Sequence, residues 1–499
     1  MSVQRKLVEE PLTQQELESW LWKAADILRG AVKPEGYGSC ILPLLFFKRL
    51  SDVYQDEFKA ALEKYKSEKV AKESFVHKLA DIPNGCLWDD IRKETKDVGG
   101  KLNDVLGEIA RANPDLDGVI NRTDFNKPEE IPSDRLAKLI EHFSQKNLGN
   151  KRVPADVLGN AYEYLLKQFN EVAPKRAGEF YTPREVVKVM VEILDPSEGA
   201  EIYDPCAGTG GMLIVSHYHL LSKKKEPKKL FLFGQEINAE TCATARMNVI
   251  LHGLEAEIRQ GDTLADPKFL EGNGLRKFDF VLANPMWNQD GYRDLMENDR
   301  LGRFSYGIAP TSSADWGWIQ HMLASLKPNG KMGVVLDQGA LFRGGAEGKI
   351  RQKVVEGDLV ECVVALPEKI FYNTGAPGCL IFLSKSKPEE RKERILFVYA
   401  AKDFEKLKNM NRLRDRDIEK SVQAYKDFDD LARYAAVVSM DKIRENDFNL
   451  GVTRYVDVFE EDEQIDVPQT WRELNELEEE RNAINTKLGT YLEELGYER

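Results

Sequence analysis

Four residues at the end of an apolar stretch have the side chains needed to act on a flat, amino-bearing group. Residues 280–283 read as a buried strand, and Asn284, Pro285, Met286 and Trp287 follow directly. The Asn284 side-chain oxygen and the Pro285 carbonyl can accept the two N–H bonds of an exocyclic amine, which favours a tetrahedral, attacking nitrogen held in line. Trp287 can stack on the ring that carries the amine. We predict that these four residues form a catalytic corner.

A glycine-rich loop upstream predicts where a second reactant binds. It reads DPCAGTGG, residues 204–211, and its glycines let the backbone turn tightly and approach a ligand. The spacing matches neither the dinucleotide fingerprint nor the phosphate-binding P-loop. An acidic residue before Ala-Gly-Thr-Gly suits the methionine end of S-adenosylmethionine. The predicted cofactor-binding residues of this loop are Asp204, Ala207, Gly208, Thr209, Gly210 and Gly211.

Two further acidic residues end the next two predicted strands. Glu236 is placed to accept hydrogen bonds from ribose hydroxyls, and Asp262 to meet an adenine edge. Each acid alone is more often a surface carboxylate. Three acids at successive strand ends favour one shared cofactor site.

An aromatic segment before the loop opens a helix with Pro183 in its first turn. Phe180 and Tyr181 can pack against the sulfonium, a cation that gains from an aromatic face. The alternative is that both aromatic residues belong to an ordinary core.

The elements that must position these residues alternate between strand and helix from about residue 150. This alternation predicts an α/β, doubly wound sheet, in which ligands sit outside the carboxyl ends of the strands. The predicted strands are residues 200–204, 230–237, 256–262, 277–285, 330–338, 359–366, 379–385 and 395–400.

Helical segments flank this region on both sides. Thr13 to Glu16 fits a capping box before an amphipathic helix, and the first 145 residues predict a helical interaction domain. From about residue 465, apolar residues recur at steps of three and four, which indicates a helix that docks on a partner or folds back on its own domain. We expect domains at 1–145, 146–460 (catalytic) and 461–499.

Composition narrows the class of protein. The formal net charge of −13 argues against a chain that grips nucleic acid tightly by itself. The six cysteines are scattered without a C-x-x-C pair, which favours a reducing compartment, the cytoplasm, and argues against a metal site. We also expect no membrane span and no secretory signal.

The ordered set FYTPR, DPCAGTGG and NPMW resembles the N6-adenine DNA methyltransferases, and the longer frame resembles the modification subunit of type I restriction–modification systems. The supporting stretches are LWKAADILRG, ILPLLFFKRLSD, DWGWIQHML, IFYNTGAPGCLIFL and NDFNLGVTRYV. The resemblance implies methyl transfer from S-adenosylmethionine to adenine N6 of a base flipped out of duplex DNA. It assigns catalysis to Asn284, Pro285, Met286 and Trp287, and cofactor binding to Glu179, Phe180, Tyr181, Thr182, Pro183, Arg184, the loop residues above, Glu236 and Asp262.

The resemblance also implies partners: a DNA specificity subunit, a second copy of this chain and, as a further candidate, a restriction subunit. Two residues depart from the family pattern. Met286 replaces the usual second proline, and Trp287 replaces the commoner Phe or Tyr. Neither change removes an acceptor or the stacking face, although Met leaves the turn more backbone freedom than Pro.

Other functions stay open on the sequence alone. An Asn-Pro-x-aromatic corner also suits RNA adenine, cytosine N4 or a glutamine amide. A non-catalytic scaffold with a methyltransferase fold is the alternative of a different class.

Overall fold

The computed structural model describes residues 11–74, 80–172, 182–223, 230–371, 374–408, 410–458 and 467–495. Residues 1–456 form one compact unit and residues 457–499 a second.

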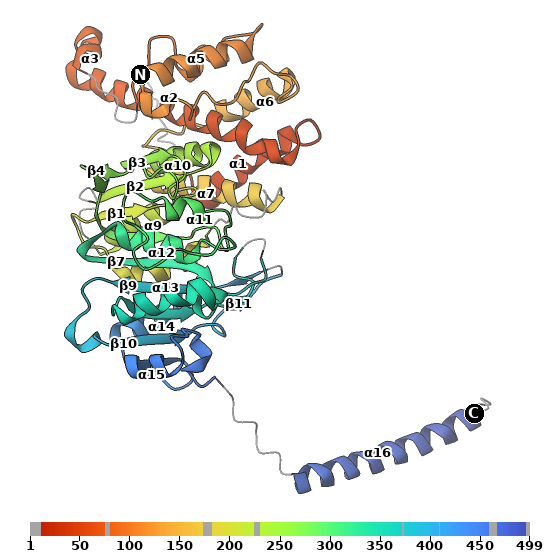
Figure 1. The fold of residues 1–499 in the computed structure, drawn as a ribbon. Helices are drawn as coiled ribbons and strands as arrows, with labels where there is room; N and C mark the ends of the chain where they lie inside the picture. The colour runs from red at the N-terminus through yellow and green to blue at the C-terminus, as the bar shows by residue number, and fades with distance from the viewer. Residues whose placement is uncertain are drawn as a thin grey trace. The chain divides into compact units, whose positions relative to one another are not determined.

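The first unit begins with a set of helices (Figure 1), and all of them except α3 contribute to one apolar core. The capping box predicted at Thr13 is confirmed: its Oγ1 accepts from the Glu16 backbone N–H at 3.3 Å, and the Glu16 carboxylate accepts from the Thr13 N–H at 3.0 Å. These helices are α1 (Gln14–Leu28), α2 (Tyr37–Tyr65), α3 (Glu68–Ser74), α4 (Trp88–Arg92), α5 (Val98–Ala112), α6 (Ser133–Ser144) and α7 (Ala155–Val172).

A nine-stranded sheet follows, in the order β13-β10-β8-β9-β7-β6-β1-β2-β3. The run from β7 through β6, β1 and β2 to β3 is parallel, whereas β9 is antiparallel to both β7 and β8. The strands are β1 (Glu201–Asp204), β2 (Phe231–Glu236), β3 (Ala256–Gln260), β6 (Phe278–Ala283), β7 (Leu326–Asp337), β8 (Val360–Ala365), β9 (Gly378–Ser384), β10 (Arg394–Tyr399) and β13 (Ala435–Ser439). The α/β prediction and its eight strands are confirmed, and β13 was not predicted.

Helices cover the sheet and connect its strands. Helix α8 packs on α9 and α14, while α12 packs on β7 and α13. The helices of this region are α8 (Arg184–Leu194), α9 (Gly211–Ser222), α10 (Ala239–Leu251), α11 (Arg293–Glu297), α12 (Asp315–Ala324), α13 (Gly345–Glu356), α14 (Asp415–Asp427) and α15 (Met440–Glu445). Two hairpins of short strands add β4 (Leu270–Glu271), β5 (Gly274–Leu275), β11 (Glu405–Lys406) and β12 (Asn411–Arg412).

Helix α10 joins the two cores of the first unit. Ala243, Met247 and Leu251 recur every four residues and pack in the N-terminal core, whereas Ala245 and Val249 pack in the core of the sheet. The core of the N-terminal helices also includes residues of α7. The boundary placed at residue 145 stays a prediction.

The second unit contains α16 (Val467–Glu494). Its side chains are solvent-exposed along one apolar seam, formed by Trp471, Leu474, Leu477, Ile484, Leu488, Tyr491 and Leu495. Among the described helices of the whole chain, none has the length and apolar character to cross a membrane.

Candidate active site

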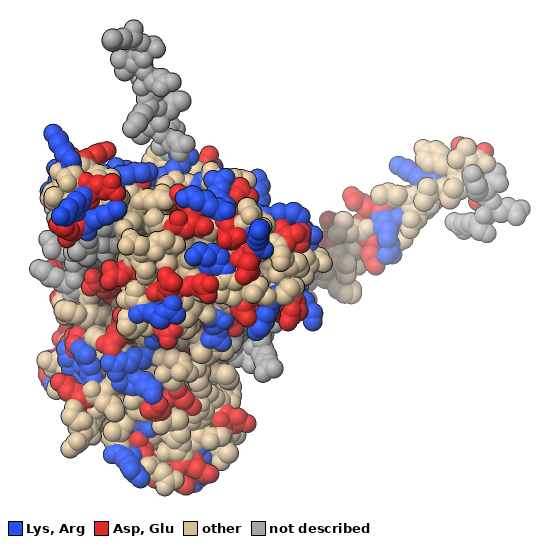
Figure 2. Space-filling view, turned by 90° about the horizontal axis from the view of Figure 1, so that it is seen from above, with Lys and Arg blue, Asp and Glu red and all other residues tan. Residues whose placement is uncertain are grey.

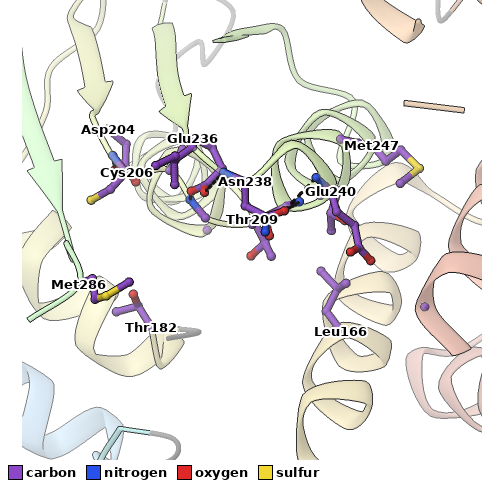
Figure 3. Close-up of a pocket in the computed structure, with 18 of the residues that line it drawn as sticks. Leu166, Thr182, Asp204, Cys206, Thr209, Glu236, Asn238, Glu240, Met247 and Met286 are labelled. Carbon is purple, nitrogen blue, oxygen red and sulfur yellow. Dashed lines mark hydrogen bonds between the residues drawn. The ribbon is translucent and has the colours of Figure 1, made fainter. Parts of the chain in front are cut away.

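The residues predicted to bind the cofactor or act in catalysis lie together at the carboxyl ends of β6, β1, β2 and β3, because these strands are parallel neighbours. A cavity of about 630 Å³ opens at this edge. Asp204 and Glu236 end neighbouring strands beside it, with Thr182 and Met286 on one side and Leu166 and Met247 on the other (Figure 3). A volume of this size is typical of small-molecule sites.

The loop after β1 is shaped by its backbone. Gly208 and Gly210 have φ of +53° and +84°, a left-handed conformation that L side chains rarely adopt. A Cβ at Gly208 or Gly211 would meet no atom within 4 Å, so the loop turns an open backbone surface outward. The Ala207 N–H donates to the Gln235 carbonyl at 2.8 Å, and the Asn248 amide donates to the Thr209 carbonyl at 2.9 Å. The loop is therefore held before any ligand arrives.

Glu236 is held by backbone donors at the end of β2. One carboxylate oxygen accepts from the Gly208 N–H at 2.9 Å and the other from the Asn238 N–H at 2.8 Å. A carboxylate has about four acceptor sites in all, so accepting these two N–H bonds does not exclude a ligand hydroxyl.

Asp204 is a buried carboxyl group, 2 % exposed, that accepts from the Cys206 N–H at 3.1 Å. Burial, together with a smaller effect of the nearby Glu236 carboxylate, raises the pKa of Asp204 to about 8. A cation bound beside Asp204 would favour its ionised form.

Asp262 is engaged by its own turn and by a loop beyond the corner. One oxygen accepts from the N–H groups of Leu264 and Ala265 at 3.0 and 3.2 Å, and the other accepts from the Tyr292 hydroxyl at 2.9 Å. Burial raises the pKa of Tyr292, which stays a neutral donor. Asp262 and Tyr292 both line the cavity, and the hydrogen bond between them holds the Tyr292 side chain in place.

The corner after β6 is oriented by side-chain hydrogen bonds. The Asn284 amide donates to Thr182 Oγ1 at 2.9 Å, and the Trp287 indole N–H donates to Asn284 Oδ1 at 3.2 Å. Pro285 is buried and Met286 is 41 % exposed at the cavity. The Trp287 ring packs edge-on against Phe371, with ring centroids 5.0 Å apart.

The residue after the corner is clamped by carboxylates. Asn288 has φ +53°, a conformation that Asn tolerates better than most residues. Its backbone N–H donates to Asp315 at 2.9 Å and its side-chain amide to Asp337 at 2.6 Å. Arg343 bridges Asp315, Asp337 (3.1 Å) and Glu347 (2.7 Å). Burial raises the pKa of Asp315 to about 6. We call these five residues the Asn288 clamp.

The structure brings most of the predicted residues to one cavity. Those lining it are Thr182, Asp204, Ala207, Gly208, Thr209, Gly211, Glu236, Asp262, Asn284 and Met286. Among the described residues, Pro183, Arg184, Gly210, Pro285 and Trp287 are not part of the lining. Glu179, Phe180 and Tyr181 lie outside the described residues. The assignment of each residue to cofactor or catalysis stays a prediction.

Arg184 is directed at α7 instead of at the cavity. It donates to Asn160 at 2.8 Å and pairs with Glu163 at 3.3 Å. Glu163 is a buried carboxyl group whose pKa is raised by burial, so Arg184 is its main compensating charge. The guanidinium thus ties the start of α8 to the last of the N-terminal helices.

Several lining residues had no part in the sequence-based prediction. Ile237, which directly follows Glu236, is 53 % exposed and offers an apolar surface; its position after a strand-end acid was a usable signal. The N-terminal helical region also contributes; of its lining residues, only Leu42 and Pro43 lie in a stretch quoted for the resemblance, and none was predicted to belong to the site. The lining residues of this region are Pro34, Glu35, Gly38, Ser39, Leu42, Pro43, Val119, Arg122, Thr123 and Glu130.

Comparison with known proteins shows which family this chain belongs to. Residues 153–464 match the family model "N-6 DNA Methylase", and residues 17–143 match "HsdM N-terminal domain". The chain belongs to the N-6 DNA methylase family, among the type I methylase subunits. The predicted family, adenine N6 of DNA as methylation target and S-adenosylmethionine as methyl donor are confirmed by this membership.

The relatives cover almost the whole chain. The MjaVIII methylase subunit of a type I restriction enzyme from Methanocaldococcus jannaschii is 38% identical over 97% of this chain and 86% of its own length. The HindI methylase subunit from Haemophilus influenzae is 30% identical over 85% of this chain and 97% of its own. The crystal structure of a type I restriction–modification methyltransferase subunit from Streptococcus thermophilus is 29% identical, with a TM-score of 0.76, covering 89% of this chain and all of its own.

The residues present fit S-adenosylmethionine in charge. Its sulfonium and ammonium groups are cations, and six carboxyl groups line the cavity: Glu35, Glu130, Asp204, Glu236, Glu240 and Asp262. Within the described part of the chain, no three His, Cys, Asp or Glu residues are arranged to hold a metal ion.

Proposed function

We propose that the corner after β6 accepts the N6 amino group of an adenine flipped out of duplex DNA, beside a cofactor held at the ends of β1, β2 and β3. The observation that carries this is the juxtaposition of Asn284 with the open glycine loop and the held Glu236 on one cavity. An adenine inside the duplex cannot reach such a cavity, so the base must leave the stack.

Each residue at the corner has a defined task. Asn284 Oδ1 and the Pro285 carbonyl accept the two N6–H bonds, which withdraws the nitrogen lone pair from the ring and directs it to the methyl group. The Trp287 ring gives the base an apolar surface, and the neighbouring side chains exclude water. S-adenosylmethionine supplies a methyl group on an electrophilic sulfonium.

The cofactor is held by groups that are already in position. The loop 204–211 presents its backbone to the methionine end, with Asp204 facing the cations. Glu236 has acceptor capacity for ribose hydroxyls, and Ile237 and Tyr292 line the adenine side. Thr182 contacts Asn284 directly, so the segment before α8 contributes to the same site.

The test is methyl transfer by this chain purified with its specificity partner, using labelled S-adenosylmethionine and duplex DNA. Nucleoside analysis should find N6-methyladenine, and Asn284→Ala should lower kcat at least about 100-fold by analogy with the loss of one preorganised polar group. Asn113→Ala, which removes an amide bonded to the end of α5, is the matched control and should keep full activity. Wild-type product on cytosine N4, RNA or glutamine, or full activity of Asn284→Ala, contradicts the proposal.

A DNA specificity subunit is the proposed source of sequence recognition. Figure 2 shows Lys and Arg interspersed with Asp and Glu on one face of the molecule, in place of a single basic surface. The charge of −13 points the same way. The assembly also takes a second copy of this chain, with a restriction subunit as a further candidate.

The exposed seam of α16 is the proposed docking element. Seven large apolar side chains, six on α16 and Leu495 directly after it, are each 48–72 % exposed and need a partner surface. Removing residues 467–499 should abolish co-purification of the specificity subunit while leaving S-adenosylmethionine binding intact. Co-purification of the truncated chain would exclude this role.

We place the assembly in the cytoplasm. All six cysteines are free and five of them are buried, which suits a reducing compartment.

A further inference from the structure

The Asn284 amide has one hydrogen-bonding neighbour on each side. Its Nδ2 faces Thr182 Oγ1 and its Oδ1 faces the Trp287 indole N–H. A threonine hydroxyl can donate or accept, so Thr182 alone leaves both orientations of the amide possible. An indole N–H can only donate, so the amide atom that faces Trp287 must be the oxygen.

The indole ring is held from its far side. Phe371 packs edge-on against it at an interplanar angle of 79°. At Gly378, where β9 begins, an added Cβ would lie 3.3 Å from Trp287 Cη2 and 2.5 Å from the Phe371 ring. Only a glycine leaves room for both rings, and the packed ring aims its N–H at Asn284.

The orientation of this amide decides what the reacting amine meets. With Oδ1 in the observed position, the second lone pair of the oxygen is left to accept an N6–H bond. With the amide turned over, the amine would face another N–H donor and lose its acceptor. The commoner Phe or Tyr of the family pattern carries no indole N–H.

We propose that Trp287 is a positioning residue: its indole N–H fixes the Asn284 amide with the oxygen in the place that accepts the adenine amino group. This inference rests on the proposed role of Asn284. It adds to stacking a second task for Trp287 that an aromatic ring without an N–H cannot perform.

The test separates the N–H group from the ring. Trp287→Phe keeps an aromatic face and removes the donor, and should lower kcat about three- to tenfold while KM for DNA and for S-adenosylmethionine stays unchanged. Asn284→Asp places oxygen at both positions, so orientation no longer matters there. In the Asp background, measured under single-turnover conditions, Trp287→Phe should cause no further loss.

Two results would overturn the inference: an equal loss in both backgrounds, or no loss in the Asn background. Should Asn284→Asp be too slow to measure, 2-aminopurine in place of the target adenine decides. The 2-aminopurine fluorescence reports base flipping, and kcat is measured separately on DNA with the target adenine. For Trp287→Phe, a lower kcat with unchanged fluorescence supports the orienting role, whereas loss of both assigns Trp287 to stacking alone.

A matched control removes a different indole hydrogen bond. Trp88 donates to Ser144 Oγ at 2.9 Å in the N-terminal core, and Trp88→Phe should lower thermal stability without changing kcat. Activity of the wild type and its loss in Asn284→Ala establish the proposed function independently, so a failure of the Trp287 experiment is distinguishable from a failure of that function.

Discussion

The loop after β1 and the corner after β6 end neighbouring parallel strands, yet different kinds of groups hold them in place. At the loop, left-handed glycines set the turn, and its main-chain groups are bound by the Gln235 carbonyl and the Glu236 carboxylate of β2 and by the Asn248 amide of α10. At the corner, side chains set the geometry: Thr182, Trp287 and the Asn288 clamp, with Arg343 more than fifty residues away in the chain. The loop that we propose for the cofactor is thus shaped mainly by its backbone, whereas a distributed set of side chains orients the proposed acceptor Asn284.

The largest effect is expected when a glycine of the loop that has a left-handed backbone conformation is replaced by a residue with a side chain. Gly210→Val places a β-branched residue at φ +84°, and the strain should weaken S-adenosylmethionine binding about thirtyfold by calorimetry. Gly199 has φ +85° at the opposite end of β1, with no atom within 4 Å of an added Cβ. Gly199→Val is therefore the control: it should introduce the same backbone strain but leave the affinity for S-adenosylmethionine unchanged. Equal losses of affinity in both variants would mean that strain acts on the fold as a whole.

The matching test of the corner removes the cation of the Asn288 clamp. Arg343→Met leaves three carboxylates without their shared partner and should destabilise the protein by about 2–3 kcal/mol, at or below the range for broken buried pairs because Arg343 is 28 % exposed. We expect a lower kcat with unchanged cofactor affinity. Arg92→Met, which breaks an exposed pair with Glu141, should match the wild type in chemical denaturation. Reduced cofactor affinity in Arg343→Met would show that loop and corner are not separately held.

The pH dependence of S-adenosylmethionine binding should arise from Asp204, in the loop after β1, and not from residues of the corner after β6. The pKa of Asp204 is raised to about 8, so this carboxyl group is largely protonated at lower pH and ionises as pH rises. A cationic ligand prefers the ionised form, so affinity for S-adenosylmethionine should increase as pH rises towards 8 and then level off. Asp204→Asn should remove that component of the titration. Affinity that stays flat or falls over this range would contradict the assignment.

The smallest effect is expected at the departure from the family pattern. Met286 is exposed at the corner, and the neighbouring Asn288 is already fixed by Asp315 and Asp337. Met286→Pro should therefore change the methylation rate less than about threefold, because the turn gains little from a locked φ. A sharp rise in rate would show instead that the natural corner is loose.

The elements and motifs of this protein were readable from the sequence for a local reason. Apolar stretches located the main strands, and helical periodicity located the helices between them. Strand β13 was not predicted because it is a short edge strand without a chemical motif. DPCAGTGG and NPMW each lie within eight residues of chain, so their chemistry is visible without the fold. The acids after β2 and β3 were found by the same reasoning about strand ends.

The partners of those residues were not readable, because they come from distant segments. Arg184 sat in a predicted cofactor segment, but its side chain pairs with Glu163 of α7. Of the lining residues from α2 and from residues 119–130, only Leu42 and Pro43 lie in a stretch that supported the resemblance, and none was predicted to belong to the site.

The sequence by itself determined the α/β fold, the family and the four strand ends that we propose as the site of the chemistry, since these depend on periodicity and short motifs. Only the tertiary structure decided how the Asn284 amide is turned, which residues clamp Asn288 and where Arg184 points. Those choices depend on hydrogen bonds between side chains that the fold brings together, and a linear spacing rule does not describe them.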